Sequence, residues 1–410
     1  MVKQTLAMAT DTNLPSTRSL PGSGKELYGA FSEEWMPDPK AMTIQSFFRS
    51  LGLACRKARC IFACAVVCAA GFCLPEASLA AEPLPQELVA IGTIGRNVVL
   101  ERTDTDEVFA QIATHGIAPR EIVPSADGRL LFVITNGRSL VEVIDIAARK
   151  VIDTVNLSSP GQNVKLFGLA VNPRGDTIFV NVICIDRARD SVRGEQPQIW
   201  AVDRATHKVT KLLQSFLGVH LLVLSPTNDR LLYAFGADIY IIDLDTRRIV
   251  KTIRFQSNLV PGVGSLTMSC SPLFVQTDVL SCPTQRTDPI TGREFGGLLT
   301  FDLKTAEWDQ MDLGPAVMWD SSVISPDRTR AFAVWNELYV VDLAQRKVIA
   351  VKNLPTTEGS VNISRDGKKL YVSDGSPSIL IFDANTLKVI KTIALPETTA
   401  NCELRVIYPR

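Results

Sequence analysis

The chain has 410 residues, with 43 basic and 43 acidic side chains and a formal net charge of zero. Nucleic-acid and membrane-surface partners are held by an excess of positive charge, so this balance argues against both. Apolar residues make up 46% of the chain, which is ample material for a core. The length allows one large domain or two medium ones.

The first eighty residues read as a targeting segment. An apolar run at residues 60–74 follows a basic patch and precedes "SLA", which ends at Ala80. The run is too short for a comfortable transmembrane helix, and "SLA" fits the small-residue rule for signal cleavage. We interpret residues 42–80 as a secretory signal peptide cleaved after Ala80, and residues 1–41 as a wrongly assigned start or a disordered extension. The mature protein is expected in the periplasm without a membrane anchor. A retained anchor is the alternative.

A four-strand phrase recurs through residues 81–410. An aspartate ends the third strand of six units, and an earlier copy surrounds Glu101: the aspartates are Asp145, Asp203, Asp243, Asp302, Asp342 and Asp383. The turn before the second strand recurs as well, as in "SADGRLLFV" and "SRDGKKLYV". Asp203 and Asp243 are 40 residues apart, and a period of this size with four strands is typical of β-propeller blades. Residues 81–410 are therefore predicted to form an all-β, seven-bladed propeller.

The two ends of the repeat region complement one another. The first unit begins at "ELVAIGTI", a second-strand sequence, and lacks an inner strand of its own. The last stretch, "RVIYPR", matches the inner-strand sequence "LAVNPRG" of another unit. We expect the C-terminal strand to complete the first blade and to remove the exposed sheet edges.

Two units are longer than the others. The excess falls at residues 183–198 and 280–297, which we place between the second and third strands of blades three and five. In an up-and-down blade these loops share one face with the crossovers between blades. Long loops on one face of a rigid scaffold often carry binding, so this face is the expected binding face. Tolerated surface padding is the alternative.

The first residues of the inner strands are expected to border the mouth of the central channel on that face. Seven positions are equivalent by counting back from each turn, namely Arg120, Phe167, His220, Leu266, Asp320, Gly359 and Glu403. His220, Asp320 and Glu403 could form a polar mouth with Trp319 as an aromatic wall, and Arg120 and Phe167 complete the candidate set. Packing or solvated rim positions are the alternative for each. The pattern indicates no catalytic residue.

The cysteines give no cofactor signal. The chain has no Cys-x-x-Cys-His motif, so no c-type haem is expected, and no metal-binding spacing is present. Export to an oxidising compartment would allow some cysteines to pair. We place Cys270 at a turn and Cys282 at the far end of the second strand of blade five. That strand would span roughly 25 Å, so a Cys270–Cys282 disulfide is not expected.

The chain resembles the YVTN-type propellers and, more closely, the β chain of quinohemoprotein amine dehydrogenase. The resemblance is densest in "ADIYIIDLDTRRIVKTI", "GGLLTFDLKT" and "NELYVVDLAQRKVIAVKNL". It implies a propeller subunit without its own cofactor, which walls the active site of a periplasmic enzyme that oxidises primary amines to aldehyde and ammonia. It also implies two partners: a cytochrome subunit with two haems c, and a small subunit that bears cysteine tryptophylquinone. It carries over no catalytic residue.

Two other functions remain open from the sequence. One is a non-enzymatic periplasmic YVTN-type propeller that binds a ligand or a protein. The other is a free-standing propeller enzyme such as a lactonase, which needs a channel metal or clustered histidines and carboxylates. The chain has three histidines, which argues against the second.

Overall fold

The part of the chain that the structure describes is built from β-strands and turns. The computed structural model describes residues 83–187, 190–255, 266–268, 278–315, 319–355, 359–373 and 375–410. The expected signal peptide, its cleavage after Ala80 and the extension before it lie outside these residues. Within them there is no helix, and hence none that could span a bilayer. The all-β prediction is confirmed.

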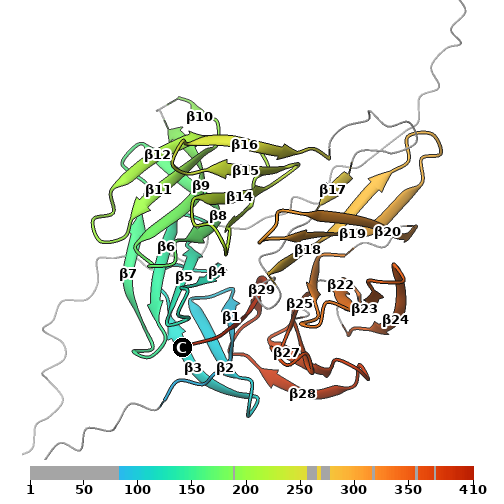
Figure 1. Cartoon of the computed structure of the whole chain (residues 1–410). Helices are drawn as coiled ribbons and strands as arrows, with labels where there is room; N and C mark the ends of the chain where they lie inside the picture. Colours follow the sequence, from blue (N-terminus) through green and yellow to red (C-terminus); the bar gives the residue numbers. More distant parts are fainter. Residues whose placement is uncertain are drawn as a thin grey trace, which may run out of the picture. The chain divides into compact units, whose positions relative to one another are not determined.

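Across this part of the chain, seven antiparallel sheets form a ring, so the predicted seven-bladed propeller is confirmed (Figure 1). We number the blades along the chain and give the strands of each from the inside outward. Blade one contains β29 (Thr399–Ile407), β1 (Leu88–Thr93), β2 (Asn97–Arg102) and β3 (Glu107–Ala113). Blade two contains β4 (Arg120–Pro124), β5 (Leu130–Thr135), β6 (Leu140–Asp145) and β7 (Lys150–Asn156). Blade three contains β8 (Gln162–Val171), β9 (Thr177–Arg187), β11 (Gln198–Asp203) and β12 (Val209–Gln214), with the short β10 (Val192–Gly194) paired to β9.

The remaining four blades are regular four-stranded sheets. Blade four contains β13 (Leu221–Leu224), β14 (Leu231–Phe235), β15 (Ile239–Asp243) and β16 (Arg248–Ile253). Blade five contains β17 (Leu266–Met268), β18 (Val279–Thr287), β19 (Glu294–Asp302) and β20 (Trp308–Pro315). Blade six contains β21 (Ser321–Ile324), β22 (Arg330–Val334), β23 (Glu337–Asp342) and β24 (Lys347–Asn353). Blade seven contains β25 (Ser360–Ile363), β26 (Lys369–Ser373), β27 (Ser378–Asp383) and β28 (Val389–Ala394).

The C-terminal strand closes the ring, as predicted. β29 pairs antiparallel with β1, with Leu88 opposite Ile407 and Ile91 opposite Leu404. All four of these side chains are buried. The N-terminal and C-terminal parts of the propeller are therefore held in one sheet, and β1 has a paired strand on both of its edges.

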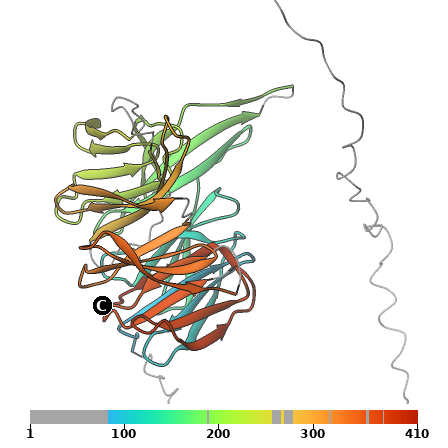
Figure 2. The same ribbon diagram turned by 90° about the vertical axis from the view of Figure 1, so that its right-hand side faces the viewer.

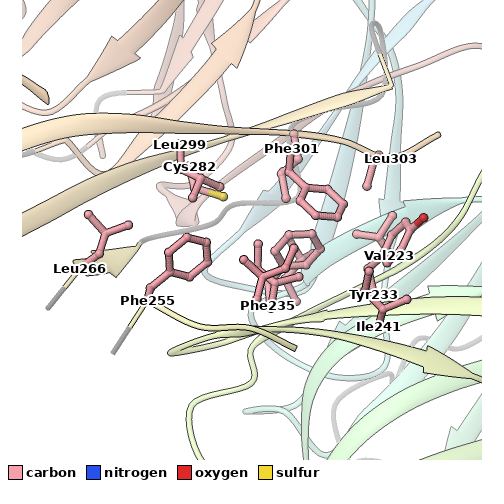
Figure 3. Close-up of a cluster of buried hydrophobic side chains, with 14 residues drawn as sticks. Val223, Tyr233, Phe235, Ile241, Phe255, Leu266, Cys282, Leu299, Phe301 and Leu303 are labelled. Carbon is pink, nitrogen blue, oxygen red and sulfur yellow. The ribbon is translucent and has the colours of Figure 1, made fainter. Parts of the chain in front are cut away.

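Apolar side chains fill every interface between neighbouring blades. Among the described residues, buried apolar side chains form seven clusters, one for each interface. Between blades four and five, the rings of Phe235 and Phe301 meet edge to face with centroids 5.3 Å apart (Figure 3). Full burial of such a side chain stabilises the fold by about 1.5–3 kcal/mol. Alternation along each strand buries residues on both faces of a sheet, because each blade has a neighbour on either side.

The repeated aspartate caps the turn between the third and fourth strands. The Asp203 carboxylate accepts hydrogen bonds from the Thr206 hydroxyl at 2.7 Å and the Thr206 N–H at 2.8 Å. The same contact recurs at Asp243 and Asp383. These hydrogen bonds lower the pKa of all three carboxyls. The motif seen in the sequence is thus a side-chain substitute for backbone turn bonds.

The propeller has two unlike faces. We call the face with the loops between second and third strands, and with the crossovers between blades, the loop face; the opposite one is the turn face. On the loop face, β9 continues to Arg187 and pairs with β10, so part of the insertion at residues 183–198 is an extended hairpin. Figure 2 shows this green hairpin reaching past the neighbouring strands. β18 and β19 form a second long hairpin, from Val279 to Asp302.

One strand assignment in blade five was wrong. β17 pairs with the far end of β18, with Leu266 opposite Arg286, so the second strand covers 279–287. Cys282 lies inside this strand, opposite Leu299, and not at its end. The loop expected at residues 280–297 is therefore shorter, because residues 280–287 belong to β18 and residues 294–297 to β19. Cys282 is disulfide-bonded, while Cys184 is a free, buried thiol. Cys270 lies outside the described residues.

Candidate functional site

The inner strands of blades two and three are irregular near the loop face. The register of β4 shifts between Arg120 and Val123, and that of β8 shifts between Phe167 and Leu169. Glu121 has a φ of 51°, in the left-handed region that costs a residue with a Cβ about 1–2 kcal/mol. Such bulges re-aim side chains and are frequent beside functional sites.

The bulge in β4 directs the Glu121 carboxylate into a network between blades. One carboxylate oxygen accepts a hydrogen bond from the Gly168 N–H at 2.8 Å, and the other accepts from the Arg138 guanidinium. Gly168 has a φ of 77°, and a Cβ there would come within 3.0 Å of the Leu222 nitrogen. The bulge also takes the Ile122 N–H out of the regular ladder, and Glu403 of β29 accepts it at 2.9 Å.

Three arginines and two glutamates gather at this point; we call them the channel cluster: Arg120, Glu121, Arg138, Glu403 and Arg405. Burial raises the pKa of Glu121 to about 7, against the lowering effect of Arg138. Burial also lowers the pKa of Arg405 to about 10, opposed by Glu403 and Glu121. Burial and the charge of Arg138 lower the pKa of Arg120. The cluster therefore combines fixed positive charge with a carboxyl that can gain or lose a proton near neutral pH.

A cavity of about 300 Å³ adjoins the cluster on the turn-face side. Its wall is mainly apolar and comes from inner strands, including Leu169, Leu222 and Ile407. Arg405, which is 1% exposed, lines this cavity and interacts electrostatically with both glutamates of the cluster. An apolar pocket whose lining includes two arginines, Arg405 and Arg410, suits a small molecule with an apolar body and an anionic head.

The structure places the residues expected at the channel mouth in different settings. Arg120 and Glu403 belong to the channel cluster. Phe167 lies beside it, with the Arg138 guanidinium 4.8 Å from its ring centroid. His220 is half-buried, and its Nδ1 lies 2.9 Å from the Gly218 carbonyl oxygen.

Trp319 and Asp320 lie in blade six, at the start of its inner strand. The Trp319 ring is 6% exposed and packs against Tyr339, with ring centroids 5.5 Å apart. It belongs to the apolar cluster between blades five and six. Asp320 is exposed, and its N–H donates to the Val334 carbonyl at 2.9 Å. Both residues thus come from blade six, whereas the channel cluster comes from blades one and two.

Sequence reasoning missed Glu121, Arg138 and Arg405. Counting along regular strands cannot detect a bulge, so it selected Arg120 and passed over the strained neighbour. Arg405 could have been found from the sequence, because it is the one charged residue in the stretch "LRVIYP". Arg138 sits in a short loop with no distinguishing pattern. In the part of the chain that the structure describes, no group of three or more His, Cys, Asp or Glu side chains is arranged to hold a metal ion.

The loop face exposes large apolar side chains. Six of them lie in its loops and crossovers: Ile94, Ile117, Val192, Phe216, Leu217 and Ile290. Val192 is 71% exposed and Ile290 is 78% exposed, and both belong to the enlarged loops. The other exposed large apolar residues of the described chain lie on outermost strands, and none lies in the turns of the turn face. Among the described residues, the exposed large apolar side chains therefore lie on the loop face, apart from those of the outermost strands.

Comparison with protein-family models finds no match, and comparison with curated proteins finds none either. Solved structures are similar in fold. An oligogalacturonate lyase in complex with manganese has 15% identity and a TM-score of 0.50, over 77% of this chain and 92% of that one. A functionally unknown protein from Desulfotomaculum acetoxidans has 11% identity and a TM-score of 0.50, over 79% and 100%. Dihydro-heme d1 dehydrogenase NirN has 18% identity and a TM-score of 0.48, over 78% and 75%. At these identities the likeness concerns the propeller fold alone.

Proposed function

We propose that this propeller is a docking subunit, without a cofactor of its own, in a periplasmic complex of the quinohemoprotein amine dehydrogenase type. Its loop face would hold a small quinone-bearing subunit and wall the site of primary amine oxidation. A cytochrome subunit with two haems c would receive the electrons. The haem and the cysteine tryptophylquinone would belong to these partners.

The apolar side chains on the loop face carry this proposal. Val192, Leu217 and Ile290 are each more than two-thirds exposed, and they come from blade three, the crossover after it, and blade five. The turns of the turn face carry no exposed large apolar residue among the described residues. A partner that covers one face would gain the burial of these side chains, at about 25 cal/mol per Å² of apolar area. The resemblance in sequence supplies the nature of the partners.

Isolation of the protein from its native periplasm tests the proposal. Under mild salt it should carry with it a chain with haem absorbance and a small crosslinked chain. This complex should reduce a dye when a primary amine is added, while the separated propeller should be colourless and inert. Recovery of the propeller alone, without haem absorbance or amine-dependent dye reduction, would favour the second candidate function.

That second candidate is a non-enzymatic binding propeller, and the channel supports it. The cavity beside Arg405 is mainly apolar, and the cluster contains three guanidinium groups against two carboxyls. A small carboxylic acid with an apolar body would fit this arrangement. Calorimetric titration with short-chain and aromatic carboxylates should then show binding that Arg405→Met removes, in a protein that has no haem-containing partner.

A further inference from the structure

A second cavity opens on the turn face, between blades one and seven. It has a volume of about 580 Å³ and is lined largely by polar residues: Gln86, Glu87, Thr103, Asp104, Ser364, Arg365, Asp366, Lys369 and Tyr371. The size falls in the range of small-molecule sites. It shares no lining residue with the channel cavity and lies on the face opposite the enlarged loops.

The Tyr371 hydroxyl lies at the wall of this cavity without a hydrogen-bond partner. The side chain is 0% exposed, and burial raises the pKa of its phenol, with Glu101 as the next cause. Four other blades also place an aromatic residue at this position, namely Phe132, Phe179, Tyr233 and Phe332. An aromatic ring therefore packs at this position in five blades. Three of the four residues equivalent to Tyr371 are phenylalanines, which have no hydroxyl.

Glu101 is a carboxyl in a position that the other blades fill with apolar residues. It is the next-to-last residue of the third strand, where the equivalents are Ile144, Val202, Ile242, Phe301, Val341 and Phe382. Glu101 is 0% exposed, and neither carboxylate oxygen has a hydrogen-bond partner. It stands two residues before Thr103, which lines the cavity, and its charge acts on the Tyr371 phenol in the cavity wall. An unsatisfied buried carboxyl costs several kcal/mol, so its presence among apolar equivalents points to a role.

The other acidic groups around the cavity have cationic partners. Asp104 pairs with Arg102, Asp106 with Lys369 at 2.6 Å, and Asp366 with Lys368. Lys369 also donates to the Thr103 carbonyl at 2.8 Å, so its ammonium is already held.

Glu87 lines the cavity and is satisfied at one oxygen only. Its Oε2 accepts from the Arg365 N–H at 3.1 Å, while its buried Oε1 has no partner. Burial raises its pKa. Glu87 and Glu101 together thus present three acceptor atoms that no described group satisfies.

We propose that this cavity binds a small organic cation with N–H donors, an ammonium or a guanidinium, recognised by Glu87 and the Tyr371 hydroxyl in its wall, with the nearby Glu101 carboxyl as a further acidic group. Such a ligand supplies the donor that Glu87 Oε1 lacks. It also supplies the positive charge that makes a buried carboxylate tolerable. A cation without N–H groups would provide the charge but leave the acceptors unsatisfied.

Binding is coupled to proton release. Burial raises the pKa of Glu101 to about 8, with a further increase from Asp106 and decreases from Lys369 and Lys391. The charges of Glu101 and Glu87 in turn raise the pKa of the Tyr371 phenol. In the unliganded protein at pH 7, Glu101 therefore carries a proton. An arriving cation favours the carboxylate, so the proton leaves to solvent as the ligand binds.

Titration calorimetry with methylammonium and guanidinium tests the proposal, in two buffers of different ionisation enthalpy at pH 7. The wild-type protein should bind both and release close to one proton, whereas tetramethylammonium should not bind. Glu101→Gln should abolish the proton release and weaken binding by about tenfold or more. Tyr371→Phe should weaken binding by about threefold, while Tyr233→Phe, at the same position in blade four, should leave it unchanged.

Three results would overturn it. The first is no binding of either N–H cation at millimolar concentration by the folded wild-type protein. The second is equal binding of tetramethylammonium, which would show a general preference for positive charge. The third is binding that Glu101→Gln and Glu87→Gln both leave intact, with circular dichroism confirming the fold of each variant.

Discussion

Glu403 accepts a hydrogen bond from the Ile122 N–H at 2.9 Å, although the two residues lie 281 positions apart in the chain. This bond joins the strand that closes the ring to the bulged inner strand of the next blade. Closure of the ring and the channel cluster therefore both depend on β29, which contains Glu403 and Arg405. A change in the C-terminal strand should alter both the stability of the ring and the charges in the channel.

Deletion of residues 402–410 should open the ring. β29 contributes the buried residues Leu404, Arg405, Val406 and Ile407, and its loss exposes an edge of β1. We expect aggregation in size-exclusion chromatography and a lower thermal midpoint. A truncated protein that remains monomeric with an unchanged midpoint would show that closure does not depend on this strand.

Glu121→Gln should flatten the pH dependence of stability. The pKa of Glu121 is raised from 4.5 to about 7 in the folded protein, so the folded state holds its proton more tightly than the unfolded chain. Its contribution to stability is full below pH 4.5 and is lost as the pH rises through 7. The loss is on the order of 2–3 kcal/mol. Urea unfolding between pH 5 and 8 should show a smaller decline in the variant, and an identical decline would refute the assignment.

Glu101→Leu should raise stability, most strongly at alkaline pH. The substitution restores an apolar residue at a position that is apolar in six blades and removes two unsatisfied oxygens. Because the pKa of Glu101 is raised to about 8, the wild-type protein loses stability from pH 4.5 through 8. A gain of a few kcal/mol above pH 8 is expected in thermal or urea unfolding. A loss of stability at that pH would mean that Glu101 has partners in the protein itself.

Trp319→Ala should destabilise the fold by about 3–5 kcal/mol, because the ring is buried between blades five and six. Trp319→Phe should cost less, because a smaller aromatic ring still fills part of this interface. Urea unfolding compares the two. Any test of Trp319 in amine turnover therefore needs Trp319→Phe, so that loss of fold is not mistaken for loss of function.

The repeat made the fold predictable. Blade number, ring closure and the shared face of the long loops follow from the spacing of Asp145 and its equivalents and from the match of the last strand. These features depend on short-range turn chemistry, as the bonds from Thr206 to Asp203 show. Blade five was assigned wrongly at Cys282, because a strand that contains proline and polar residues lacks the usual alternation.

The candidate site was less predictable, for a physical reason. The Glu121 carboxylate reaches Arg138 and Gly168 from a left-handed backbone conformation, and Glu101 stands out only when its blade is superposed on the six others. Both depend on local departures from the repeat. Sequence spacing locates the positions that follow a repeat, and it misplaces those that break it.

The docking function is tested most directly by paired surface variants isolated from the native periplasm. One variant carries Leu217→Asp and Ile290→Asp on the loop face, and its control carries Val250→Asp and Ile349→Asp on outer strands, where the original side chains are also exposed. Haem absorbance per propeller and amine-dependent dye reduction are measured in both. We predict at least a tenfold loss for the loop-face variant and no change for the control. Equal retention in both variants, or a wild-type propeller that isolates without haem, would contradict the account.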